Sequence, residues 1–134
     1  MSAKWTITAS QEEVSFLVEA GIIYRDGGNL QAARDVFTGV KSLFPHSDCA
    51  EVFLGTVDFQ EGEFSKAEQH YRKALELNPQ SAFAFAHLGE VSLFRKDKET
   101  ARACLKNALA LDPLGEVGKM ARRLMQLVDQ VRFV

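Results

Sequence analysis

Apolar side chains recur at helical spacing along the chain. In the stretch 67–77, AEQHYRKALEL, one stripe is formed by Ala67, Tyr71, Ala74, Leu75 and Leu77. Residues with this spacing lie on one face of an α-helix, and the charged residues between them lie on the other. Short polar segments that contain Gly, Asn or Pro, which are typical of turns, separate stretches of this kind. The pattern predicts an all-α chain.

The helix-breaking residues stand at a fixed interval. The three prolines are Pro45, Pro79 and Pro113, and 79 − 45 = 34 while 113 − 79 = 34. Three glycines repeat this interval, at Gly21, Gly55 and Gly89, because 55 − 21 = 34 and 89 − 55 = 34. Proline ends a helix or follows one, since it lacks an amide hydrogen and crowds the preceding turn. Two independent columns with one period predict a repeated structural unit.

The interval divides most of the chain into three units, which span residues 14–47, 48–81 and 82–115. Each unit is expected to hold two helices joined by a turn. The first turn, DGGN, supplies glycines for a tight turn and Asn29 as a helix cap. The third turn, RKDKET at residues 95–100, contains no glycine. We therefore expect the third turn to be the most strained.

Both ends of such a stack need a cover, because a terminal repeat has an open apolar side. Residues 116–134 predict a seventh helix that caps the third unit. Its apolar face consists of Val117, Met120, Ala121, Leu124, Leu127, Val128 and Val131. Residues 1–13 form an N-terminal extension, in which Ser10 and Glu13 predict a capping box. Trp5 anchors this extension, and three roles are open: covering the first repeat, lying in a groove, or contacting a second copy.

These features resemble the tetratricopeptide repeat (TPR) family, whose period is 34 residues and whose unit is a helix–turn–helix. The resemblance is best at Leu54-Gly55 and Leu88-Gly89, and in the segments KALELNP and NALALDP, which end at Pro79 and Pro113. It implies a right-handed superhelical stack of three repeats plus a C-terminal capping helix. It also implies a single domain over residues 1–134.

Three residues depart from the TPR pattern. Glu51 and Asp58 stand where the family has bulky apolar residues, and Lys41 stands where Leu75 and Leu109 occur in the later units. The second helix of one TPR unit packs on the first helix of the next, so Lys41 is in a position to pair with either carboxylate. A solvated edge is the alternative, since exposed ion pairs contribute little. The sequence leaves both interpretations open.

The resemblance further implies a binding surface, because the first helices of successive TPR units line a concave face. The residues carried over to that face are Ser15, Val18, Ile22, Arg25, Asp26, Cys49, Val52, Thr56, Phe59, Gln60, Phe83, Ala86, Glu90, Leu93 and Phe94. Those expected to bind a partner are Val18, Ile22, Arg25, Val52, Thr56, Phe59, Phe83, Glu90, Leu93 and Phe94. Core packing is expected for Phe16, Tyr24, Phe37, Tyr71 and Phe85. Phe59, Phe83 and Phe94 are expected to be partly exposed anchors.

A protein-interaction module is the function that such a surface predicts. TPR proteins that hold the C-terminal carboxylate of heat-shock proteins use Lys, Asn and Arg on the concave face, whereas Val18 and Ile22 stand at the leading positions here. An apolar segment of a partner protein, extended or helical, fits better. Size and an apolar groove also resemble the cytoplasmic chaperones of type III secretion. A general scaffold or adaptor without chaperone activity is the alternative, and a homodimer is compatible with either.

Composition and motifs exclude other classes of function. The net charge of −2 argues against nucleic acid as a partner. The sequence contains no glycine-rich phosphate loop, no paired zinc-ligand cysteines and no His-Glu-x-x-His motif, so we expect no enzyme, cofactor or metal. Neither a signal peptide nor an apolar run of membrane length is evident, which predicts a cytoplasmic protein without membrane insertion.

The two cysteines receive separate interpretations. Cys49 and Cys104 fall on different kinds of helix in different units, so a disulfide is not indicated. His46 and Cys49 lie three residues apart at a helix start, where a helix dipole can lower the pKa of a thiol. No third group that would orient this pair is evident, which disfavours a catalytic cysteine.

Overall fold

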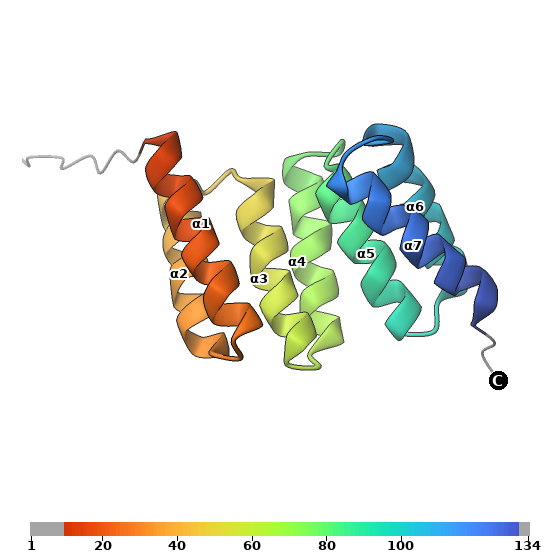
Figure 1. The fold of residues 1–134 in the computed structure, drawn as a ribbon, viewed down its shortest axis with the longest axis horizontal. Coiled ribbons are helices and arrows are strands. Elements are labelled where there is room, and N and C mark those ends of the chain that lie inside the picture. The colour runs from red at the N-terminus through yellow and green to blue at the C-terminus, as the bar shows by residue number, and fades with distance from the viewer. Residues whose placement is uncertain (1–9, 132–134) are drawn as a thin grey trace, which may run out of the picture. The chain divides into compact units, whose positions relative to one another are not determined.

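Within residues 10–131, which the computed structural model describes, the chain forms seven α-helices and no strand (Figure 1). They are α1 (Gln11–Asp26), α2 (Leu30–Leu43), α3 (Asp48–Gln60), α4 (Phe64–Leu77), α5 (Ala82–Phe94), α6 (Lys98–Leu111) and α7 (Glu116–Gln130). The prediction of an all-α chain made of helical pairs and a C-terminal helix is confirmed. Trp5 lies outside the described residues, so the roles considered for the N-terminal extension stay predictions.

The chain divides into two compact units. Unit 1, residues 1–46, contains α1 and α2, and unit 2, residues 47–134, contains α3 to α7. The division falls within one residue of the boundary that the sequence predicts between the first and second repeats. A single domain over residues 1–134 stays a prediction.

Polar side chains cap the starts of α1, α2, α3, α5 and α6. Ser10, Ser47 and Ser81 precede α1, α3 and α5, and each hydroxyl accepts a hydrogen bond from the amide three residues ahead, at 3.2, 3.3 and 3.1 Å. Asn29 and Asp97 do the same for α2 and α6, at 3.2 and 3.1 Å. Each bond satisfies an amide at a helix start that has no partner within the helix. The caps expected at Ser10 and Asn29 are confirmed.

The turn inside each helical pair has the same backbone conformation in all three repeats. Positive φ angles occur at Gly28 (86°), Gly62 (80°) and Lys96 (64°), and 62 − 28 = 34 while 96 − 62 = 34. At the third position the amide of Lys96 donates to the carbonyl of Leu93, and the amide of Asp97 donates to that of Ser92, which is the Schellman motif. Only the third turn places a residue with a Cβ in this left-handed region. The strain expected in the glycine-free turn is confirmed.

The glycine column at positions 21, 55 and 89 lets paired helices approach closely. At Gly55 a Cβ atom would collide with the ring of Tyr71, and at Gly21 and Gly89 it would collide with Phe37 and Leu105. These three large side chains are fully buried. A bulky residue on the second helix of each repeat therefore fills the space that the glycine leaves on the first.

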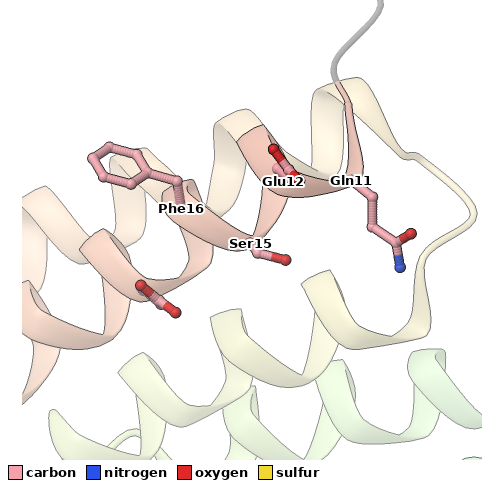
Figure 2. A pocket seen from close by; sticks show the side chains of 5 residues that line it. Gln11, Glu12, Ser15 and Phe16 are labelled. Carbon is pink, nitrogen blue, oxygen red and sulfur yellow. The ribbon is translucent and has the colours of Figure 1, made fainter.

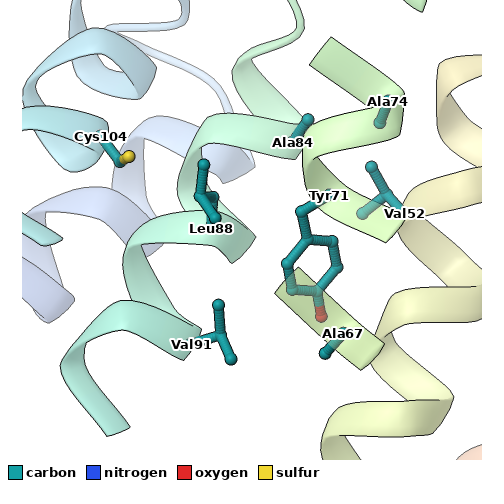
Figure 3. Close-up of a cluster of buried hydrophobic side chains, with 8 residues drawn as sticks. All are labelled: Val52, Ala67, Tyr71, Ala74, Ala84, Leu88, Val91 and Cys104. Atoms are coloured by element: carbon teal, nitrogen blue, oxygen red, sulfur yellow. The ribbon is translucent and has the colours of Figure 1, made fainter. Parts of the chain in front are cut away.

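The core of unit 2 is continuous from α3 to α6. Figure 3 shows Tyr71 of α4 between Val52 of α3 and the α5 residues Leu88 and Val91, with Cys104 of α6 on the far side of Leu88. A second cluster joins α5, α6 and α7 through Ala86, Leu93, Ala101, Leu105, Ala108, Ala121, Leu124 and Val128. Helix α7 packs against both α5 and α6, as expected for a cap on the third repeat. Leu127 is the exception on its predicted apolar face, since its side chain is exposed.

The core of unit 1 is smaller. Ala33, Phe37 and Val40 of α2 are buried, and α1 packs against α2. Two of the five aromatic residues expected in the core are not there, because Phe16 is 71% exposed and Tyr24 is 44% exposed. Helical spacing identified these residues as part of an apolar face of α1. It did not show whether another element covers that face.

Candidate partner-binding face

The ten residues expected to bind a partner are divided between the two units. Val18, Ile22 and Arg25 belong to α1 of unit 1, where all three are half-buried. The Arg25 side chain forms an ion pair with Asp26, with Nε 3.1 Å from Oδ1. The other seven belong to α3 and α5 of unit 2. Because these seven lie in one unit, their positions can be compared with one another.

Three of the seven lie inside unit 2, which corrects the predicted set. Val52 is fully buried in the cluster around Tyr71, and Leu93 is buried in the cluster shared with α7. Thr56 is buried as well, and its hydroxyl donates to the carbonyl of Phe53 at 2.6 Å. These side chains stabilise the fold and do not offer surface to a partner. The TPR frame assigned them correctly to the first helices but did not separate the two apolar sides of each helix.

Four residues of α5 form one stripe on the surface of unit 2. Phe83, His87, Glu90 and Phe94 are spaced by four, three and four residues, which puts them on one side of the helix. Phe83, His87 and Glu90 are half-buried, and Phe94 is 56% exposed. The stripe therefore runs almost the full length of α5.

Aromatic residues of α3 and α4 support both ends of this stripe. At one end the rings of Phe53 and Phe83 meet edge to face, with centroids 5.3 Å apart. At the other end Phe94 meets Phe59 edge to face at 4.9 Å and Phe64 at 5.7 Å. Edge-to-face pairs of this kind hold aromatic rings in defined orientations. We call the surface formed by Phe53, Phe59, Phe83, His87, Glu90 and Phe94 the α3–α5 face.

The α3–α5 face is aromatic, with a single carboxylate. The ring of His87 meets that of Phe83 edge to face at 4.9 Å, and its Nδ1 lies 3.3 Å from Oε1 of Glu90. None of the six residues is a Lys or Arg, so the face offers no cation to a carboxylate or phosphate. Its chemistry suits apolar side chains that pack on ring faces, with Glu90 as the charged group beside them.

Sequence reasoning placed Phe59, Phe83, Glu90 and Phe94 in this region and missed Phe53 and His87. The position of His87 could have been predicted from helical spacing. It lies four residues after Phe83 and three before Glu90, so the three residues share one side of the helix. Phe53 lies beside the buried Val52, and only its contact with Phe83 shows that it belongs to the surface.

A second group of polar side chains lies between α3 and α4. The carboxylates of Glu51 and Asp58 are buried, and the His70 ring stands between them, with Nδ1 2.8 Å from Oε2 of Glu51 and Nε2 3.3 Å from Oδ2 of Asp58. Lys73 adds a longer ion pair to Glu51 at 3.7 Å. The solvated edge considered for these carboxylates is therefore wrong. A pair with Lys41 would join the two units, and it stays a prediction.

The pKa of the Cys49 thiol is raised at its helix start, not lowered. Partial burial, followed by the nearby Asp48 carboxylate, raises the pKa of the Cys49 thiol, and burial raises the pKa of Cys104. A raised pKa leaves less thiolate at neutral pH, which lowers nucleophilicity. The expected effect of a helix start on Cys49 is thus outweighed. Both cysteines are free.

The part of the chain that the structure describes holds no candidate metal site and no candidate membrane span. Nowhere in residues 10–131 do three or more His, Cys, Asp or Glu side chains gather in a way that could hold a metal ion. None of the helices in this range combines the length and apolar character that a membrane span requires.

Two family models match the chain. One, described as TPR repeat, matches residues 55–93, and another, described as tetratricopeptide repeat, matches residues 16–47. Together they place repeats of one family in both units. No curated protein sequence gives a match.

Solved structures with the same fold cover almost the whole chain. The first TPR domain of Spaghetti (RPAP3), bound to the HSP90 peptide SRMEEVD, is 21% identical, with 92% of this chain and 96% of that chain covered and a TM-score of 0.73. The Yersinia enterocolitica type III secretion chaperone SycD, in complex with a peptide of the translocator YopD, is 16% identical, with 90% and 95% covered and a TM-score of 0.72. The Sgt2 TPR domain from Aspergillus fumigatus is 17% identical, with 91% and 80% covered and a TM-score of 0.78. At these identities the likeness establishes the fold.

Proposed function

Because this chain belongs to the tetratricopeptide repeat family, we propose that it binds an apolar segment of a partner protein on the α3–α5 face of unit 2. The observation that carries the proposal is Phe94, which is 56% exposed and yet held by ring contacts with Phe59 and Phe64. An aromatic side chain that is already oriented loses little rotamer freedom when a partner covers it. Anchors of this kind contribute much of the affinity at protein interfaces.

The chemistry of the face specifies the kind of segment. Apolar side chains of a partner, presented by a helix or an extended strand, would pack between Phe83 and Phe94 along α5. A Lys or Arg of the same segment would stand beside Glu90. An acidic C-terminal peptide is a poor candidate, because the face provides no Lys or Arg and its one charged group is a carboxylate. Two proteins with this fold hold a peptide, one from HSP90 and one from YopD, which supports binding of a peptide segment by this fold.

We also propose a partner-binding role for Val18, Ile22 and Arg25 of unit 1. They are half-buried residues of α1. Variants at these three positions test whether unit 1 binds a partner, whereas variants in α5 test the α3–α5 face of unit 2.

A selection experiment tests this function even though the partner is unidentified. Random peptides displayed on phage would be selected on the immobilised protein, and the best binders would be measured against Phe94→Glu and Leu114→Glu. Leu114 is a matched control, because it is 87% exposed and lies in the connection between α6 and α7, outside the α3–α5 face. We expect apolar peptides with a basic residue, whose binding is lost in Phe94→Glu and kept in Leu114→Glu. Equal binding to both variants would contradict the proposal.

We also propose a more specific role as a cytoplasmic chaperone that shields an apolar segment of a secretion substrate. Similarity to the type III secretion chaperone SycD supports this role at the level of the fold. The test is co-production with a translocator-type subunit from the same genome, followed by measurement of its soluble fraction. A chaperone raises that fraction, and Phe94→Glu abolishes the effect. A partner that binds equally well but is soluble on its own would indicate the alternative, a scaffold or adaptor.

A further inference from the structure

One side of α1 combines acidic and apolar side chains that are all exposed. Spacings of four, three and four residues put them on one side of the helix, and they are Glu12, Phe16, Glu19 and Ile23. We call these four residues the α1 stripe. Its apolar members, Phe16 and Ile23, are 71% and 72% exposed. Two periods later the same positions hold Ala84 and Val91, which are buried in a cluster with residues of α4. On α5, this side of a first helix therefore receives the second helix of the preceding repeat.

One side of α7 alternates charged and apolar residues in the same way. The same spacings join four residues of this helix, which are Glu116, Met120, Arg123 and Leu127. We call them the α7 stripe; Met120 is half-buried and the other three are exposed. Arg123 stands one period after Gly89, since 123 − 89 = 34, and at Gly89 the Leu105 side chain of α6 occupies the space beside α5. On α5, this side of a first helix thus receives the second helix of its own repeat.

The two stripes match each other when the helices run parallel. One common offset then pairs apolar with apolar and acidic with basic side chains, because 120 − 16, 123 − 19 and 127 − 23 all equal 104. The pairs are Phe16 with Met120, Glu19 with Arg123 and Ile23 with Leu127. An antiparallel arrangement would instead set every apolar residue of one stripe against a charged residue of the other. Spacings of four and three residues also suit helices that pack at about 20° to each other.

The charges of the two helices favour the same pairing. Helix α1 contains four acidic residues and one basic residue, whereas α7 contains two acidic and three basic residues. The common offset also places Glu12 opposite Glu116. Lys119 compensates this pair, because its Nζ lies 3.1 Å from Oε1 of Glu116. The two helices therefore attract each other, and salt screens the attraction.

The surface beside Phe16 can accept a side chain from the other helix. A shallow hollow there is lined by Gln11, Glu12, Ser15, Phe16 and Glu19 (Figure 2). Methionine fits irregular spaces of this kind, because its side chain is unbranched and has three rotatable bonds. Met120 is the residue of the α7 stripe that pairs with Phe16 in the parallel arrangement.

We propose that copies of this protein associate with one another, the α1 stripe of one copy packing in parallel on the α7 stripe of another. The two stripes are different surfaces, so the contact closes a dimer when it is made reciprocally and leaves stripes for further copies when it is made once. The contact uses none of the residues of the α3–α5 face and is independent of partner binding there.

The contact is expected to be weak. Only one helix from each copy contributes to it, whereas stable interfaces bury about 1,200–2,000 Å² in total. The ion pair between Glu19 and Arg123 lies at the surface, where such pairs add little energy but oppose a mismatched register. Association should therefore depend on protein concentration and decrease as salt is added.

Charge reversal with rescue tests the proposal, and sedimentation velocity at increasing protein concentration is the measurement. We expect the wild type to associate at low salt. Glu19→Arg and Arg123→Glu should each lower the association constant roughly tenfold, because like charges then face each other. An equimolar mixture of these two variants should associate as the wild type does, since every contact between unlike copies pairs opposite charges. Phe16→Ser should weaken association in the wild-type background.

Matched controls reverse exposed charges outside both stripes. Glu76→Arg in α4 and Lys106→Glu in α6 should associate as the wild type does. Circular dichroism spectra of all variants would show that the exposed substitutions leave the helices intact.

Three results would overturn the proposal. The first is a wild type that stays monomeric at every concentration. The second is association of Arg123→Glu equal to that of the wild type, because α7 would then take no part and an α1–α1 contact would explain the association. The third is a mixture of Glu19→Arg and Arg123→Glu that associates no better than either variant alone.

Discussion

The first and third repeats begin from one pattern and differ in what covers them. Phe37 and Leu105 are both fully buried against the glycine column, so the packing inside each helical pair is the same. Exposure differs at another pair of equivalent positions. Phe16 and Ile23 of the first repeat are exposed, whereas Ala84 and Val91, two periods later, are buried. The repeat sequence thus determines how two helices of one repeat pack. The neighbouring part of the chain determines how much of each repeat stays exposed, as expected for a fold stabilised by nearest neighbours.

The second and third repeats have side chains of different chemistry at three equivalent interior positions. Glu51, Asp58 and His70 of the second repeat correspond to Phe85, Ser92 and Cys104 of the third, because 85 − 51, 92 − 58 and 104 − 70 all equal 34. Both sets lie in buried or half-buried positions. Replacing a buried ionic group by apolar residues is often neutral or stabilising as a whole, whereas removing one partner of it is costly. The second repeat therefore has an ionic group where the third has a largely apolar one. Exchanging a single residue between the two repeats is expected to destabilise the protein, whereas exchanging the whole set is not.

The largest effect is expected where unit 2 ends. Deleting residues 116–134 would expose the apolar surfaces that α7 covers on α5 and α6 and would remove Ala121, Leu124 and Val128 from the core. We expect aggregation or a loss of at least about 3 kcal/mol in unfolding free energy, since each fully buried Val or Leu side chain contributes about 1.5–3 kcal/mol. Urea denaturation and size-exclusion chromatography measure both outcomes. A soluble truncation of unchanged stability would contradict the assignment of α7 as a cap.

The second largest effect on stability is expected at the buried ionic group of the second repeat, Glu51, Asp58 and His70. His70→Cys introduces the residue that the third repeat has at this position and leaves the buried carboxylates of Glu51 and Asp58 without the imidazole. We expect a loss of about 2–3 kcal/mol in the free energy of unfolding, because buried charged groups are costly when a partner is removed. The triple variant Glu51→Phe, Asp58→Ser, His70→Cys should recover part of this loss. An unchanged urea midpoint in His70→Cys would show that the imidazole does not stabilise the carboxylates.

Glycine-to-alanine substitutions can distinguish the effect of side-chain packing on stability from the effect of helix propensity. In Gly55→Ala the new methyl group collides with the buried ring of Tyr71, and we expect a loss of about 1–3 kcal/mol in stability. Gly39→Ala is the control, because Gly39 lies inside α2 and a methyl group there would meet no neighbouring side chain within 4 Å. That substitution should stabilise by about 0.5–1 kcal/mol through helix propensity alone. Effects of the same sign at both positions would contradict the packing role of the column.

The smallest effect is expected at the third turn. Lys96 adopts the left-handed conformation that Gly28 and Gly62 adopt in the other repeats. Lys96→Gly should therefore stabilise the protein by about 0.5–1 kcal/mol, and the reverse change Gly62→Lys should destabilise it by a similar amount. Thermal denaturation of both variants tests this pair. A loss of stability in Lys96→Gly would mean that the lysine side chain contributes more than its backbone strain costs.

Periodicity and turn residues in the sequence were sufficient to predict the helices, the caps at Ser10 and Asn29, the strained turn and the C-terminal helix. These features depend on residues close in the chain and on one repeated spacing. The sequence did not reveal that Phe16 is exposed or that Val52 and Leu93 are buried, because the first helices carry apolar residues on two sides. His70 could have been identified from the sequence as a partner of buried polar groups. It is 34 residues from both Val36 and Cys104, which are its equivalents in the other repeats. A polar residue in an otherwise apolar column indicates a buried polar partner.

The central claim is that a partner binds along α5, and backbone amide chemical shifts test it most directly. A ¹⁵N-labelled wild-type protein would be titrated with a peptide selected by phage display. Shifts should concentrate at Phe59, Phe83, His87, Glu90 and Phe94, while the amides of exposed residues of α4 and α6, such as Gln69 and Lys106, should not shift. The same titration of Phe94→Glu should show an affinity lower by roughly thirtyfold, which corresponds to about 2 kcal/mol. Shifts concentrated on α4 and α6, with α5 unchanged, would contradict the account.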